Sequence, residues 1–81
     1  MVRWEDFEER PGAVPVYAQL ADFIAAAIER GDLAPGEKLP AERDLADQIG
    51  HSPETVAKAR RLLVERGLVE SHVGRGSFVR R

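Results

Sequence analysis

The 81-residue sequence predicts a mainly α-helical fold, in which three helices are followed by a small β-hairpin. Apolar residues recur at three- and four-residue spacing in the stretches 15–30, 41–49 and 53–66, as they do along one face of a helix. A glycine stands where each of these helices is expected to end. Beyond residue 67, two short apolar runs flank a glycine-rich pentapeptide, which is typical of a hairpin.

The composition is that of one small globular domain near the lower size limit for a self-supporting core, with 43% hydrophobic and 32% charged residues. The chain has no cysteine, which excludes a disulfide framework or a thiolate metal site. No apolar run approaches the roughly 20 residues that cross a bilayer. The acidic start, MVRWEDFEER, lacks the apolar segment of a signal peptide. We therefore expect a cytoplasmic protein.

Residues 1–14 are interpreted as an irregular N-terminal arm, and residues 15–81 as the folded domain. Trp4 and Phe7 lie three residues apart in the arm and are expected to pack on the domain as core cover, the alternative being a ligand-binding or base-stacking role. Pro15 is expected to lie in the first turn of the first helix, which ends at Gly31.

The second and third predicted helices are joined by the signals of a tight turn. Ala46 is small enough for the third helix to approach, and Val56 is expected to point into the corner between the two. Gly50 can adopt the positive φ that ends the second helix. Ser52 can cap the third helix, and Pro53 suits a first turn in which no backbone donor is required. This is the layout of a helix-turn-helix, whose second helix enters a DNA major groove.

Two short strands are predicted at residues 68–71 and 77–80, with the turn HVGRG between them. An isolated hairpin is only marginally stable, so this one is expected to pack against the helices. Three helices and such a hairpin form a winged helix-turn-helix.

The charge is unevenly distributed along the chain, although the net charge is only −2. Residues 1–50 carry five basic and eleven acidic side chains, whereas residues 51–81 carry seven basic and three acidic ones. Phosphate binding responds to a local basic face, so this asymmetry is compatible with a nucleic-acid partner. The alternative is two ordinarily solvated halves that differ by chance.

Between Pro15 and Val79 the chain resembles the DNA-binding domain of the GntR family of bacterial transcription regulators. The resemblance is carried by PVYAQLADFI, GDLAPGEKLPAERDLADQIG, TVAKARRLLVERGLV and GRGSFV. It implies sequence-specific binding of double-stranded operator DNA, as a repressor and as a homodimer that forms either through the protein itself or only on DNA. The family's C-terminal sensing domain has no counterpart in these 81 residues, so no small-molecule effector is expected if the chain is full length.

The resemblance also implies a set of residues that contact DNA. Arg43 matches the Glu-Arg-x-Leu motif, whose arginine often reads a guanine; its alternative role is a salt bridge to Asp47, four residues along the helix. The recognition helix, about residues 53–66, is expected in the major groove, and the wing, about residues 72–76, at the minor groove. The candidate residues are Arg43, Ser52, Glu54, Thr55, Lys58, Arg61, His72, Gly74, Arg75 and Gly76.

Several of these candidates have a second interpretation. Ser52 can act as a cap alone, and Glu54 can serve the helix dipole instead of accepting from a cytosine. Arg75 can be an ordinary exposed charge in a hairpin turn. Many relatives carry arginines at the positions of Pro53 and Ala57, so the base preference of relatives does not transfer. Lys58 and Arg61 are expected to replace the lost charge.

An enzymatic function is not expected. His51 and His72 have neither a cysteine partner nor metal-ligand spacing, and the Gly-x-Gly at residues 74–76 opens no helix, so no cofactor or metal is predicted. The alternative function is a winged-helix interaction module that docks a basic protein partner. Convergence of the basic side chains on one face would favour DNA, and an exposed apolar patch would favour protein.

Overall fold

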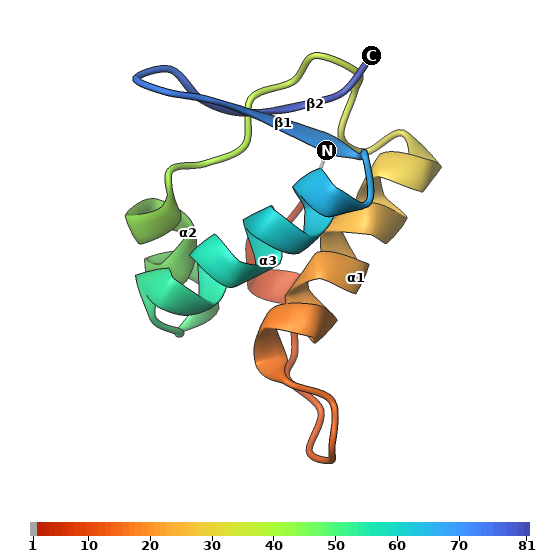
Figure 1. The fold of residues 1–81 in the computed structure, drawn as a ribbon. Helices are drawn as coiled ribbons and strands as arrows, with labels where there is room; N and C mark the ends of the chain where they lie inside the picture. The colour runs from red at the N-terminus through yellow and green to blue at the C-terminus, as the bar shows by residue number, and fades with distance from the viewer. Residues whose placement is uncertain (1) are drawn as a thin grey trace.

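A computed structural model describes residues 2–81 and confirms the predicted architecture of three helices and a wing (Figure 1). A short 3-10 turn in the arm precedes the helices, and an antiparallel hairpin follows them. The elements are η1 (Trp4–Asp6), α1 (Val16–Arg30), α2 (Glu42–Ile49), α3 (Pro53–Glu65), β1 (Val69–His72) and β2 (Gly76–Val79).

Helix α1 begins one residue later than the sequence predicts. Pro15 occupies the N-cap position in place of the first turn, with extended backbone angles, and its carbonyl accepts hydrogen bonds from the N–H groups of Ala18 and Gln19. Since proline lacks an N–H and has a fixed φ, it is tolerated on either side of this boundary. Gly31 ends the helix in the left-handed conformation, at a φ of 85°.

The turn between α2 and α3 is built as predicted. Gly50 has a φ of 74° and donates its N–H to the carbonyl of Ala46, and Pro53 is the first residue of α3. The Oγ of Ser52 accepts a hydrogen bond from the N–H of Thr55 at 3.3 Å, which caps α3. Ala46 and Val56 are both buried where α2 and α3 meet. Local sequence signals therefore place the start of α3 against the end of α2.

Both strands of the wing are displaced by one residue from the prediction, because the turn is tighter than expected. His72 pairs with Gly76, so β1 extends to His72 and β2 starts at Gly76. The N–H of Arg75 donates to the carbonyl of His72 at 3.0 Å and closes the turn. Gly74, with a φ of 77°, supplies the positive φ that this turn requires.

The segment 37–39 pairs with β2 of the wing through an isolated bridge, which the sequence did not predict. The N–H of Leu39 donates to the carbonyl of Ser77, and the N–H of Val79 donates to the carbonyl of Glu37. Lys38 thereby lies opposite Phe78 in an isolated antiparallel bridge. These bonds fasten the inner half of the hairpin to the loop before α2.

One hydrophobic core unites the helices, the wing and the arm. It consists of Trp4, Phe7, Leu20, Ala21, Ile24, Ala27, Leu33, Leu39, Leu45, Ala46, Val56, Ala59, Leu63, Val69 and Val79. Trp4 and Phe7 are buried as expected, and each ring contacts Phe23 of α1. None of the helices in residues 2–81 has the length and apolar character needed to traverse a bilayer.

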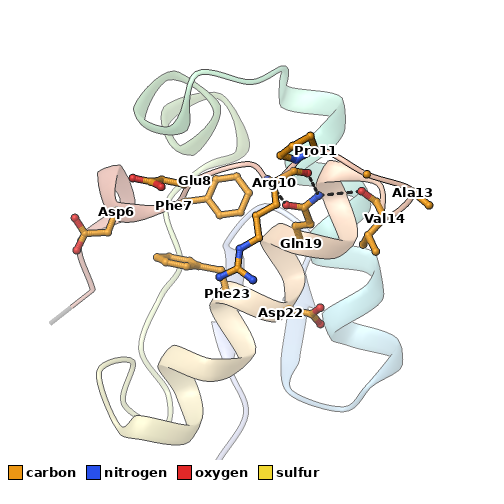
Figure 2. Close-up of a pocket in the computed structure, with 11 residues that line it drawn as sticks. Asp6, Phe7, Glu8, Arg10, Pro11, Ala13, Val14, Gln19, Asp22 and Phe23 are labelled. Atoms are coloured by element: carbon orange, nitrogen blue, oxygen red, sulfur yellow. Dashed lines mark hydrogen bonds between the residues drawn. The ribbon is translucent and has the colours of Figure 1, made fainter.

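The arm runs back along α1, where Gln19 adds hydrogen bonds to the packing of Trp4 and Phe7. Gln19 accepts a hydrogen bond from the N–H of Arg10 and donates to the carbonyls of Arg10 and Val14 (Figure 2). An open groove of about 740 Å³ lies between the arm and α1, beside the rings of Phe7 and Phe23. The arm thus covers the part of the core that α1 contributes.

Candidate nucleic-acid interface

Arg43 lies in the first turn of α2 and is exposed. The alternative pairing with Asp47 does not form, and Arg43 makes no ion pair with any acidic residue in the part of the chain that the structure describes. Its guanidinium therefore keeps all of its donors available. A planar fork of this kind can bind a guanine or a phosphate through two hydrogen bonds.

The first turn of α3 is exposed, but part of its hydrogen-bonding capacity is used within the turn. Ser52 caps the helix, and its Oγ lies 3.1 Å from the Oγ1 of Thr55. Glu54 is exposed and has no ion-pair partner among residues 2–81. The capping role predicted for Ser52 is confirmed, and both hydroxyl groups keep free lone pairs toward solvent.

The basic residues of α3 fall into two groups. Lys58 and Arg61 are exposed, and neither has an ion-pair partner within the described chain. Arg60 instead pairs with Glu42 of α2, and Arg66, directly after the helix, pairs with Asp22 of α1 at 2.9 Å. The inward-facing position is taken by Ala59, which is fully buried. Of the basic residues on α3, Lys58 and Arg61 thus remain without an ion pair on its exposed side.

The tip of the wing presents Arg75, which is exposed and unpaired in the described structure. Val73 is fully exposed beside it. His72 lies lower on the hairpin, where its ring contacts the ring of Phe78 edge to face. A Cβ on Gly76 would lie 2.9 Å from the Cε of Lys38, so a side chain at this position would displace the lysine.

A groove of about 420 Å³ separates the wing from the helix-turn-helix. Glu42, Val56 and Arg60 line it from the helices, and Lys38 and the wing residues 71, 72 and 74–77 line it from the other side. Lys38 is exposed and without an ion pair among the described residues, and sequence reasoning did not select it. Its place on the wing depends on the pairing of residues 37–39 with β2, for which the sequence carries no local signal.

Unpaired cations therefore occur on all three elements of the predicted contact surface. Figure 1 shows α2, the start of α3 and the tip of the wing on the same side of the domain, away from α1 and the C-terminus. The cations on these elements and on the adjoining loop are Lys38, Arg43, Lys58, Arg61 and Arg75. Such an arrangement can bind the phosphates of a polyanion in an extended track.

The described surface has no concentrated apolar patch for protein docking and no metal site. The large apolar side chains that are well exposed, Val14, Val64 and Val73, belong to the arm, to α3 and to the wing tip, and so do not share one element. Residues 2–81 contain no group of three or more His, Cys, Asp or Glu side chains arranged to hold a metal ion. His51 is half-buried in the turn before α3, between Glu9 and the ring of Phe7. The scattering of the exposed apolar side chains gives no support to docking of a protein partner.

Comparison with known proteins identifies the family. The family model described as bacterial regulatory proteins, gntR family, matches residues 16–79. The mannosyl-D-glycerate transport/metabolism system repressor MngR of Escherichia coli is 45% identical over 69 residues, which are 85% of this chain and 29% of MngR. The chain thus spans about three tenths of the length of this relative.

Solved structures agree with the sequence comparison. YtrA from Sulfolobus acidocaldarius, a GntR-family transcription factor, superposes with a TM-score of 0.81 at 38% identity, over 86% of this chain and 73% of that one. The DNA-binding domain of AraR in complex with operator ORX1 gives 0.79 at 37% identity, over 90% of each chain. Such relatives are regulators of transcription and not enzymes. The chain therefore belongs to the GntR family of bacterial regulatory proteins and has the winged-helix DNA-binding fold of that family.

Proposed function

We propose that this chain binds double-stranded operator DNA sequence-specifically, as a homodimeric repressor of the GntR type. The recognition helix α3 enters the major groove, and the wing contacts the adjacent minor groove. One observation carries the proposal. The cations predicted to meet DNA, namely Arg43, Lys58, Arg61 and Arg75, are all exposed and free of ion pairs within residues 2–81.

The ion pairs determine which cations are available to bind phosphates. Arg60 and Arg66 lie among these residues in the sequence but are neutralised by Glu42 and Asp22. An unpaired cation can release a condensed counterion from DNA when it meets a phosphate, and this release drives binding. A cation already paired with a carboxylate gives up that pair to do the same. The net charge of −2 is therefore no obstacle to DNA binding.

The two ends of the contact surface serve different purposes in this proposal. Arg43 reads a base edge through its fork, since the start of α2 approaches the major groove beside α3. Arg75 stands between two glycines at the wing tip, where the negative potential of a narrow minor groove attracts an arginine. Ser52, Glu54 and Thr55 present the N-terminal turn of α3 to the major groove, while His72, Gly74 and Gly76 let the wing approach the sugar-phosphate backbone closely.

The operator is expected to differ from those of many relatives. Pro53 and Ala57 stand where such relatives carry arginines, so two guanidinium groups are missing from the reading face. Lys58 and Arg61 restore charge at exposed positions of α3, but a lysine is a point charge and does not reproduce the forked geometry. Affinity is thereby maintained, whereas the preferred bases change.

Dimeric binding is proposed from the small size of the domain, and repression from the names of its relatives. A single domain of 81 residues covers too few base pairs for high specificity, so two half-sites related by a two-fold axis are expected. MngR is named as a repressor, and the AraR domain was solved in complex with an operator. By this reasoning the chain occupies its operator as a pair and excludes the transcription machinery.

Selection of bound sites from random DNA tests the proposal. We expect enrichment of an inverted repeat and a stoichiometry of two chains per duplex on the enriched site. Arg75→Ala should weaken binding and reduce the slope of log K against log salt by about 0.9 per bound chain. Arg66→Ala, which removes an arginine already paired with Asp22, is the matched control and should leave the slope unchanged.

Three results would contradict parts of this proposal. Failure to enrich any sequence would refute specific DNA binding. One chain on an asymmetric site would refute the dimer. Equal slopes for the Arg75 and Arg66 variants would refute the assignment of the wing as a phosphate- and groove-contacting element.

A further inference from the structure

The guanidinium of Arg60 joins three elements of the winged helix. From its position on α3 it donates through Nε to the Oε2 of Glu42 at 2.7 Å, and its Nη2 forms an ion pair with the same oxygen at 2.6 Å. Through Nη1 it donates to the Oγ of Ser71 at 2.7 Å. Glu42 is the first residue of α2, and Ser71 lies on β1. We call these three side chains the Arg60 bridge.

The Arg60 bridge holds the wing at the point where the wing leaves the core. Val69 is buried at the base of β1, but the strand is exposed from Glu70 outward. Backbone hydrogen bonds attach β2 to the loop at residues 36–39, on the side away from α3. Among residues 2–81, the bond from Arg60 to Ser71 is the polar contact that links the strands of the hairpin to a helix. It therefore adds a polar link between β1 and α3 to the backbone bonds that hold β2 on the loop.

An arginine is required for this geometry. The planar guanidinium presents one edge to Glu42 and a separate nitrogen to Ser71, so both bonds form at once and at a defined angle. A lysine ammonium would keep the charge but would present one point to two acceptors. The bridge is also only partly shielded, because the side chain of Arg60 retains 27% exposure. It is thus a positioning contact and not a component of the hydrophobic core.

Each element joined by the bridge carries a cation from the proposed contact surface. Arg43 follows Glu42, Arg61 follows Arg60, and Arg75 lies four residues beyond Ser71. We propose that Arg60 is a positioning residue that sets the angle of the wing relative to α3, and that it thereby determines specificity at the base pairs beneath the wing. This inference rests on the proposed function, since it assumes that the wing and α3 contact neighbouring segments of one DNA site.

Two substitutions distinguish a positioning role of Arg60 from an effect of its charge. Ser71→Ala removes the wing end of the bridge without changing any charge, at an exposed position of a strand. Arg60→Lys keeps the charge beside Glu42 but loses the fork. The probe is the duplex enriched by selection, with base pairs changed either beneath α3 or beneath the wing. The wing segment is identified as the part of the footprint that Arg75→Ala loses.

In the wild type, each changed base pair should weaken binding about fivefold or more in both segments. In Ser71→Ala and Arg60→Lys, a base-pair change beneath α3 should weaken binding as it does in the wild type. A base-pair change beneath the wing should weaken binding less than about twofold. Independently of DNA, ¹⁵N relaxation of the Val73 and Arg75 amides should show increased mobility in both variants. Arg66→Lys, which alters a different α3 pair with Asp22, is the matched control and should behave as the wild type.

The following outcomes decide whether Arg60 positions the wing. A selective loss beneath the wing together with mobile wing amides supports the proposal. An unchanged penalty beneath the wing, or an equal loss in both segments, overturns it. An Arg60→Lys protein that behaves as the wild type also overturns it, because charge alone would then suffice. If the wild type enriches no sequence, the proposed function fails, and unchanged wing relaxation in both variants would overturn the inference separately.

Discussion

Gly50→Ala tests how strongly the turn of the helix-turn-helix depends on its glycine. Gly50 ends α2 with φ 74° and ψ 33°, in the left-handed region. A Cβ built at this position meets no atom within 4 Å, so the substitution creates no steric clash. The cost is therefore the backbone conformation alone, about 1–2 kcal/mol for an L-residue other than glycine or asparagine. In a domain of this size that corresponds to a melting temperature lower by about 4–16 °C.

Thermal unfolding, monitored by circular dichroism, measures this loss of stability. Two further variants show whether the backbone conformation of Gly50 is its cause. Gly50→Asn should recover part of the loss, because asparagine tolerates the left-handed region. Gly31→Ala is the matched control, since Gly31 ends α1 at a φ of 85° and is equally uncrowded. It should lower the melting temperature by a similar amount, yet operator affinity measured well below both transitions should fall only for Gly50→Ala. A Gly50→Ala protein that melts within about 1 °C of the wild type would refute the reasoning.

The remaining predictions concern the cap and the base contact. Ser52→Ala removes the acceptor for the Thr55 N–H and should cost about 1 kcal/mol, which calorimetry would detect as a melting temperature lower by about 4–8 °C. Ser52→Asp keeps an acceptor and should melt near the wild type; equal losses in both variants would exclude the cap as the cause. Arg43→Ala should cost about 1–3 kcal/mol of discrimination at one base pair of each half-site, measured by competition between single-substituted duplexes. Uniform weakening on all duplexes would instead assign Arg43 to a phosphate.

The helices and the order of elements were predictable because their signals are local. Gly31 and Gly50 end α1 and α2, and Ser52 with Pro53 begins α3, each acting within four residues of its own position. The errors are also local. Pro15 precedes α1 as its cap, and both strands of the wing are displaced by one residue because the turn closes at Arg75. Boundaries of this kind depend on which of two neighbouring backbone groups finds a partner.

The basic candidate contact residues could be selected from the sequence, but their ion pairs could not be predicted from it. The sequence offers seven basic side chains after residue 50 and does not say which of them are neutralised. Arg43 and Asp47, whose salt bridge was the alternative interpretation, lie four residues apart and form no ion pair. Lys38 was overlooked because its neighbour Gly76 is 38 positions distant and is reached only through the pairing with β2.

By itself, the sequence determined the fold class, the helix-turn-helix and the family to which the chain belongs, since caps, turns and apolar periodicity act over one or two helical turns. Only the tertiary structure decided which cations remain free for DNA. Arg60 is paired with a carboxylate 18 residues away and Arg66 with one 44 residues away, and such partners meet only when α1, α2 and α3 pack. The same packing directs Arg60 toward Ser71 of β1, which is the contact proposed to position the wing.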